Sequence, residues 1–197
     1  MSAQNTVKPS ADSIARAATA AAKKGPPPVH LWNPPFCGDL DMEIRRDGTW
    51  FYMGTPIGRH ALVKLFSSVL KLEDGKYFLV TPVEKVGIRV VDAPFVAVDF
   101  TASGTGADQS LTFVTQVDDT VTAGPDHPIR VVRDPDTGEP APYVMVRAGL
   151  EALIDRKSFY RLVDLADTQD HDGTEWLGVW SGGAFFPIIP MAELPAD

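Results

Sequence analysis

The sequence predicts an α+β fold made of two duplicated hairpin–helix–strand units whose sheets are mainly antiparallel. Short apolar runs separated by turn residues such as Asp-Gly indicate hairpins. Two longer stretches carry apolar residues at helical spacing. These two stretches also match each other along the chain, as expected of an internal repeat.

The chain begins with an Ala-rich segment, residues 1–25, which we expect to be flexible or peripheral. A short helix fits Ser13–Ala22, but Ile14 is its only large apolar residue. The next stretch, "GPPPVHLWNPPFCGDLD", is stiffened by proline near the polyproline II conformation. We expect it to be an extended arm that packs Trp32 and Phe36 against the globular body. The alternatives are one wall of a ligand cleft, or a proline-rich ligand for another protein.

The first repeat unit is predicted to span residues 26–117, including the arm. A hairpin fits Met42–Arg46 and Thr49–Met53, because Asp47-Gly48 between them suits a tight turn. A helix fits Arg59–Leu70, where apolar residues recur at helical spacing. Four further strands are predicted at Tyr77–Thr81, Val86–Val91, Phe95–Thr101 and Leu111–Val117.

The second repeat unit is predicted to span residues 118–197. Its predicted hairpin joins Pro128–Arg133 to Pro142–Arg147 through a turn rich in Asp, Pro and Gly. A helix fits Arg156–Ala166, with Asp155 as its N-cap. The last strands are predicted at Glu175–Trp180 and Phe185–Ile189.

The internal repeat is predicted from segments that match at an offset of 97 residues. Ile57-Gly58-Arg59 matches Ile154-Asp155-Arg156, and one residue later in register Asp74-Gly75 matches Asp172-Gly173. We therefore expect the regions around these matches to have the same order of strands and helix.

Composition limits the classes of function. The chain has 18 basic and 26 acidic residues, a net charge of −8, which disfavours general nucleic-acid binding. Its single cysteine, Cys37, allows no internal disulfide and suits a reducing compartment, so we expect a cytoplasmic protein. No apolar run approaches the roughly 20 residues that cross a bilayer.

The sequence contains stretches that resemble motifs for catalysis or metal binding, but the residues around them do not support these functions. Gly104-Thr105-Gly106 is followed by a predicted strand, so no helix N-terminus is available to bind a pyrophosphate. The four histidines share no spacing typical of metal ligands. No catalytic residue or metal ligand is predicted, and the sequence does not identify a cofactor.

Three segments carry a resemblance to a known family. They are "NPPFCGDLDMEIRRDGTWFYMGTPIGRHALVKLF", "LVTPVEKVGIRVVDAPF" and "FYRLVDLA…GVWSGGAFFP". Together they resemble the uncharacterised proteobacterial proteins grouped as domain-of-unknown-function family 1285, over about residues 26–190. The resemblance implies an α+β fold with a duplicated motif and a C-terminal half loosely like pleckstrin-homology barrels. It also implies a binding site in the cleft between the repeats and a role in signalling or ligand sensing. Since the family has no established activity, no catalytic residue is carried over.

The function favoured by the sequence is a non-catalytic binding or sensory module that holds a small anionic ligand or a protein partner between the repeats. Trp32 is the candidate for stacking on the ligand, and Arg59 and Lys85 are the candidates for binding an anionic group. Glu84 or Asp92 would orient the ligand. One alternative is a hydrolase or transferase acting on a small phosphorylated metabolite, and another is a protein-interaction scaffold.

Overall fold

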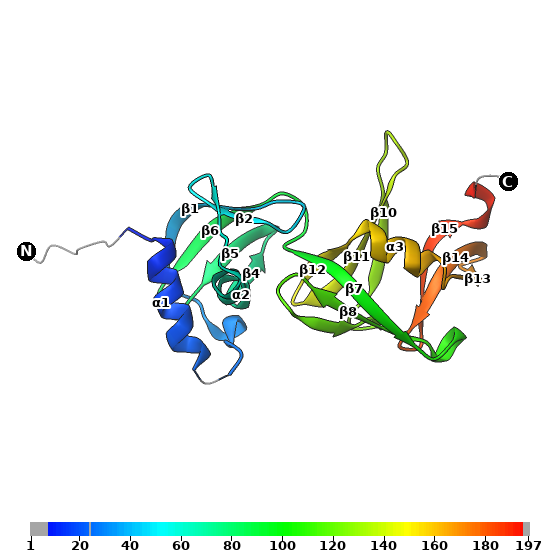
Figure 1. Cartoon of the computed structure of the whole chain (residues 1–197), viewed down its shortest axis with the longest axis horizontal. Coiled ribbons are helices and arrows are strands. Elements are labelled where there is room, and N and C mark those ends of the chain that lie inside the picture. Colours follow the sequence, from blue (N-terminus) through cyan, green and yellow to red (C-terminus); the bar gives the residue numbers. More distant parts are fainter. Residues whose placement is uncertain (1–7, 24, 195–197) are drawn as a thin grey trace, which may run out of the picture. The chain divides into compact units, whose positions relative to one another are not determined.

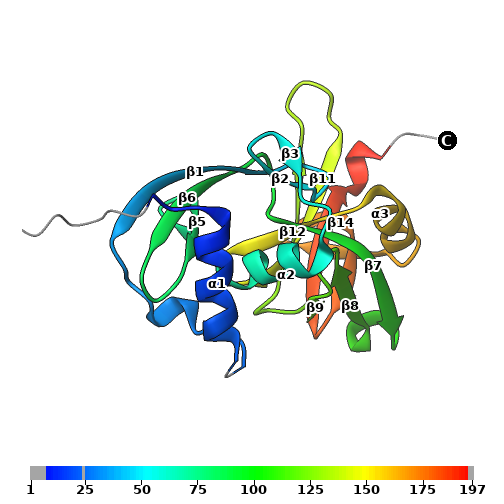
Figure 2. The same ribbon diagram turned by 60° about the vertical axis from the view of Figure 1, so that its left-hand side comes forward.

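The computed structural model describes residues 8–23 and 25–194, and the chain divides into two compact units. Unit 1 is Met1–Asp92 and unit 2 is Ala93–Asp197 (Figures 1 and 2). The boundary predicted from the sequence lay after residue 117, and the observed one differs. Residues 93–117 belong to unit 2 because the strand that begins at Phe95 pairs with residues 152–154 of that unit.

Unit 1 contains one six-stranded sheet, called here the N-terminal sheet. Its strands are β1 (Phe36–Ile44), β2 (Trp50–Tyr52), β3 (Thr55–Pro56), β4 (Leu70–Glu73), β5 (Lys76–Val80) and β6 (Lys85–Val90). They lie in the order β3-β2-β1-β6-β5-β4. The central pair, β1 and β6, is parallel and every other pair is antiparallel. The predicted Asp47-Gly48 hairpin is confirmed as the connection between β1 and β2.

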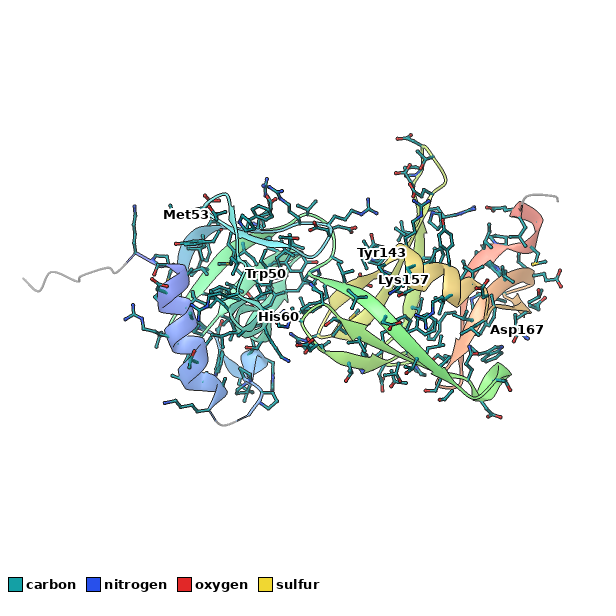
Figure 3. All side chains as sticks on the ribbon, in the orientation of Figure 1. Trp50, Met53, His60, Tyr143, Lys157 and Asp167 are labelled. Atoms are coloured by element: carbon teal, nitrogen blue, oxygen red, sulfur yellow. The ribbon has the colours of Figure 1, made fainter. Side chains whose placement is uncertain are left out.

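The helical elements of unit 1 are α1 (Ala11–Ala22), the short 3-10 helix η1 (Val29–Leu31) and α2 (His60–Ser68). The ring of Phe66 in α2 stacks on Trp50 of the sheet at 6.2 Å (Trp50 is labelled in Figure 3), so α2 covers one sheet face. Of all helices that the structure describes, none is long and apolar enough to cross a membrane.

Helix α1 packs onto unit 1 with one buried face and includes the helix that the sequence predicted at Ser13–Ala22. Ser10 and Ser13 form a reciprocal capping box at its start, which satisfies backbone donors of the first turn. Ile14 and Ala18 are fully buried, and α1 packs against α2. The prediction underestimated this contact because alanines bury little area individually but allow two helices to approach closely.

Unit 2 contains a second six-stranded sheet, the C-terminal sheet, and a small sheet of three strands. The strands of the C-terminal sheet are β7 (Phe95–Ser103), β8 (Ser110–Thr115), β9 (Thr120–Thr122), β10 (Ile129–Arg133), β11 (Pro140–Arg147) and β12 (Leu150–Ile154). The small sheet is formed by β13 (Asp167–His171), β14 (Thr174–Ser181) and β15 (Ala184–Pro190). The helical elements are η2 (Gly106–Asp108), α3 (Arg156–Val163) and η3 (Met191–Glu193), and Asp155 caps α3 through its side chain as predicted.

The two six-stranded sheets confirm a duplication, but in a different register from the predicted one. The C-terminal sheet has the order β10-β11-β12-β7-β8-β9, with β7 and β12 parallel at its centre. When its strand order is read from the opposite edge, each strand of the C-terminal sheet corresponds to one strand of the N-terminal sheet. Each sheet consists of two three-stranded meanders, which are joined where the first strand of the sheet lies beside its sixth strand. The offset of 97 residues is wrong because it pairs α2 with α3. Helix α2 lies between the third and fourth strands of its sheet, whereas α3 follows the sixth.

The small sheet is fastened to the C-terminal sheet by buried hydrogen bonds. The hydroxyl of Ser181, which is 0% exposed, donates to the Ala123 carbonyl at 2.7 Å and accepts from the Leu111 N–H at 2.9 Å. Nearby, the Gln109 side chain donates to the Trp180 carbonyl at 2.9 Å. These bonds satisfy backbone groups that would otherwise be buried without partners.

Candidate ligand-binding site

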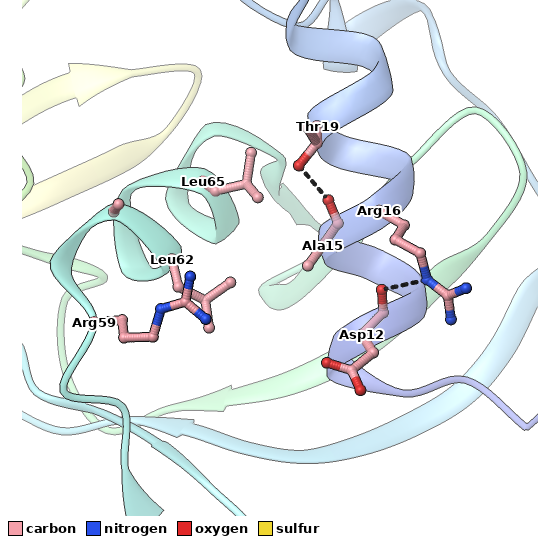
Figure 4. A pocket seen from close by; sticks show the side chains of 8 residues that line it. Asp12, Ala15, Arg16, Thr19, Arg59, Leu62 and Leu65 are labelled. Atoms are coloured by element: carbon pink, nitrogen blue, oxygen red, sulfur yellow. Dashed lines mark hydrogen bonds between the residues drawn. The ribbon is translucent and has the colours of Figure 1, made fainter.

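A groove of about 430 Å³ lies between α1 and α2 in unit 1 (Figure 4). Its size falls within the range of about 300–1,000 Å³ that is usual for small-molecule sites. It is lined by Asp12, Ala15, Arg16, Thr19, Arg59, Ala61, Leu62 and Leu65.

Helix periodicity explains how the sequence forms this groove. Asp12, Ala15 and Thr19 recur at intervals of three and four residues, so they share one face of α1. The adjacent face, with Ile14 and Ala18, is buried and holds α1 in place. Because Ala15 ends at its Cβ atom, it leaves open space where a larger side chain would fill the groove.

The floor of the groove is apolar and its rim carries charges. Leu62 and Leu65 of α2 contribute the largest apolar side chains. Arg59 is the N-cap residue of α2, and its side chain reaches into the groove from that position (Figure 4). Asp12 and Arg16 lie on the α1 side, where the Arg16 Nε donates to the Asp12 carbonyl at 3.4 Å.

The guanidinium of Arg59 is available to a ligand. Arg59 is exposed, and within residues 8–23 and 25–194 its side chain forms no ion pair or hydrogen bond. A guanidinium binds a carboxylate or phosphate through two parallel N–H groups. The groove therefore combines an apolar floor with a cationic group suited to an anionic, partly apolar molecule.

Lys85, the other predicted anion-binding residue, is engaged in an ion-pair cluster. Its Nζ lies 2.8 Å from Oε2 of Glu73, while the Nζ of Lys71 lies 2.7 Å from Oε1 of the same carboxylate. The side chain of Lys85 is only 18% exposed. Hydrogen bonds from Lys71 and then Lys85 lower the pKa of Glu73 below its usual range.

Arg59 and Lys85 lie on different sides of the N-terminal sheet. Val86 is fully buried and pairs with Leu79 on the face that α2 covers, so Lys85, one residue earlier, points to the opposite face. Arg59 lies at the start of α2. The two candidate cations therefore lie on opposite faces of the sheet, and the groove contains Arg59 without Lys85.

The arm residues have mixed placements. Trp32 is half-buried and its carbonyl accepts a hydrogen bond from the Lys71 Nζ at 3.4 Å, which brings it to the Lys71–Glu73–Lys85 cluster. Phe36 is 55% exposed, so its predicted burial is wrong. It lies in β1 and meets Phe78 edge-on, with the ring centroids 6.0 Å apart.

The two predicted orienting carboxylates lie apart from the groove. Glu84 is half-buried in the turn between β5 and β6, where its carbonyl accepts from the Thr81 N–H at 2.9 Å. The Asp92 carboxylate lies 3.1 Å from the Arg46 Nε. Of the five predicted site residues, only Arg59 lines the groove.

The α1 side of the groove was missed from the sequence. Neither Asp12 nor Arg16 was among the residues predicted for the site. Their spacing of four residues on one helix face was the available signal. Across the described part of the chain, no group of three or more His, Cys, Asp or Glu side chains could hold a metal ion.

Comparison with known proteins relates both units to one family. Residues 27–93 match the model of a domain of unknown function, the DUF1285 N-terminal domain. Residues 94–188 match the model of the DUF1285 C-terminal domain, also of unknown function. The two matched ranges meet one residue after the boundary between units 1 and 2. The comparison with curated proteins found no match.

Two solved structures are similar to this chain. A DUF1285 family protein from Silicibacter pomeroyi DSS-3 is 63% identical, with a TM-score of 0.84, over 91% of this chain and 96% of that one. A DUF1285 family protein from Shewanella baltica OS155 is 29% identical, with a TM-score of 0.52, over 65% of this chain and 94% of that one. As its sequence motifs indicated, the chain belongs to the DUF1285 family.

Proposed function

We propose that the protein is a non-catalytic, cytoplasmic binding module that holds a small anionic molecule in the groove between α1 and α2. The observation that carries this proposal is the guanidinium of Arg59, which has no ion-pair partner among the described residues, beside an apolar groove of about 430 Å³. A ligand with an acidic head and a short apolar body matches both features, since Arg59 binds the head and Leu62 and Leu65 contact the body.

Asp12 restricts the charge of the ligand. Its carboxylate lines the same groove as Arg16 and Arg59, so the three side chains leave a net charge of +1, which one negative charge on the ligand balances. We therefore favour a monoanion, such as a carboxylate with an apolar chain, over a multiply charged phosphate ester.

A sensory role would follow from the way α1 is held. The buried anchors of α1 are Ala11, Ile14 and Ala18, which amount to few apolar groups for a helix of 12 residues. A ligand that contacts both α1 and α2 adds interactions that exist only when α1 is docked, so it shifts α1 toward the docked state. Participation in signalling, and a loose likeness of unit 2 to pleckstrin-homology barrels, are further proposals supported by the family resemblance alone.

Thermal unfolding with octanoate tests this function. Octanoate carries one carboxylate and a short apolar chain, and at a hundredfold excess over its Kd it should stabilise the fold by about 2.7 kcal/mol. Arg59→Ala should abolish that stabilisation. The matched control is Lys157→Ala, which removes an exposed cation from the first turn of α3 in unit 2. Equal stabilisation of the wild-type and Arg59→Ala proteins would refute the proposed site.

A further inference from the structure

The small sheet of unit 2 carries aromatic side chains on one face. Trp176, Gly178 and Trp180 alternate along β14, so they share a face, and Phe185 joins it because it pairs with Trp180. His171 pairs with Thr174 and points to the same side. The opposite face holds Val179 and Phe186, which are buried at 0% and 7% exposure.

Three of the rings on this face, those of His171, Phe185 and Trp180, are connected by contacts. The centroids of Trp180 and Phe185 lie 5.4 Å apart at an interplanar angle of 58°, and those of His171 and Phe185 lie 6.2 Å apart at 50°. Gly178 makes room for this arrangement, since a Cβ atom there would lie 2.5 Å from the Phe185 ring. His171, Trp176, Trp180 and Phe185 are all partly exposed. We call these four side chains the aromatic face.

The surroundings of the aromatic face are strongly acidic. Residues 162–194 contain six Asp and Glu residues and no Lys or Arg, and one of the six, Glu193, forms an ion pair with Arg133 of β10. Asp167 projects from β13 on the same face as Trp176, because it pairs with Gly178 (Asp167 is labelled in Figure 3). Unit 2 as a whole carries 17 acidic and 6 basic residues, a net charge of −11, against +3 for unit 1 with 12 basic and 9 acidic residues.

We propose that the aromatic face binds an organic cation of the quaternary or alkylated ammonium class. The face of an aromatic ring carries a negative quadrupole that attracts a cation, and such rings recognise quaternary ammonium groups in other proteins. The acidic surroundings raise the local concentration of cations and repel anions, including nucleic acids. This site lies in unit 2 and is independent of the groove in unit 1.

Titration with choline, followed by NMR of the tryptophan indole N–H groups, tests the proposal. The chain has four tryptophans, two on the aromatic face and two, Trp32 and Trp50, in unit 1. Choline should shift the indole signals of Trp176 and Trp180 in a saturable way and leave the other two in place. Its uncharged isostere, 3,3-dimethylbutan-1-ol, should bind more weakly by about 2- to 30-fold, since it lacks the cation–π attraction.

Two variants separate the cation site from a general apolar surface. Trp176→Leu should weaken choline binding by about 2- to 30-fold, and Trp32→Phe in unit 1 serves as the matched control without effect. Asp167→Asn should also weaken it, and this variant keeps the test valid should Trp176→Leu fail to fold, because Asp167 is exposed. Equal binding of choline and its uncharged isostere, or no shift of Trp176 and Trp180, would overturn the proposal.

Discussion

Ser181→Ala should strongly destabilise unit 2, although the substitution removes only one oxygen atom. The hydroxyl bridges the Leu111 N–H and the Ala123 carbonyl, and Ser181 is 0% exposed. With alanine, both backbone groups remain buried without these partners, and each such group costs about 1–3 kcal/mol. The free energy of unfolding should therefore fall by about 2–6 kcal/mol, a large fraction of the stability of an ordinary domain.

The chain provides a matched control for this change. Ser158 is also 0% exposed, but within the described residues its hydroxyl has no hydrogen-bond partner. Ser158→Ala removes an unsatisfied hydroxyl from the core, so it should be neutral or stabilising. Urea denaturation of both variants, compared through the midpoint and slope of the transition, measures the difference. Losses of stability that agree within about 0.5 kcal/mol would refute the reasoning, because burial alone would then explain both results.

Two further predictions concern unit 1. Because the folded-state pKa of Glu73 lies below its usual value of 4.5, its ion pairs stabilise the fold fully above about pH 4.5 and are lost as the pH falls through the folded pKa. The difference in unfolding free energy between wild type and Glu73→Gln should accordingly be constant near neutral pH and shrink in acid, and a difference independent of pH down to pH 3 would contradict this assignment. Ile14→Ala removes the largest buried side chain of α1, so hydrogen exchange should accelerate in the α1 amides and stay unchanged in unit 2; unaltered protection of α1 would show that other contacts hold it.

Local sequence signals predicted most of the elements. The Asp47-Gly48 hairpin, the helix after Asp155 and the strand at Phe185–Ile189 are found where turn chemistry, capping and alternation indicated them. Each of these signals depends on a few neighbouring residues, so it can be recognised without knowledge of the tertiary structure.

The pairing of strands could not be predicted in the same way. Sheet order depends on contacts between distant residues, such as those that place Ala152 beside Phe95 in a parallel pair. The sequence match at an offset of 97 compared two amphipathic helices, and such helices resemble each other through their common period whether or not they occupy equivalent places. The duplication is real, but only the strand order shows its register.

The candidate site was predicted only at Arg59. Lys85 was a reasonable candidate as an isolated cation, but Glu73 lies two strands away in the sheet, and the sequence gives no sign of that pairing. The α1 side of the groove was missed because its small side chains contribute by leaving space open, and a sequence pattern does not show such space.

Calorimetric titration of octanoate into four proteins tests the central claim most directly. The wild type and Lys157→Ala should bind one molecule per chain with the same affinity. Arg59→Ala should lose binding because the carboxylate has no cation, and Ala15→Trp should lose it because the indole fills the groove at a partly exposed helix position. Wild-type affinity in both Arg59→Ala and Ala15→Trp would contradict the account, since neither the charge nor the space of the groove would then matter.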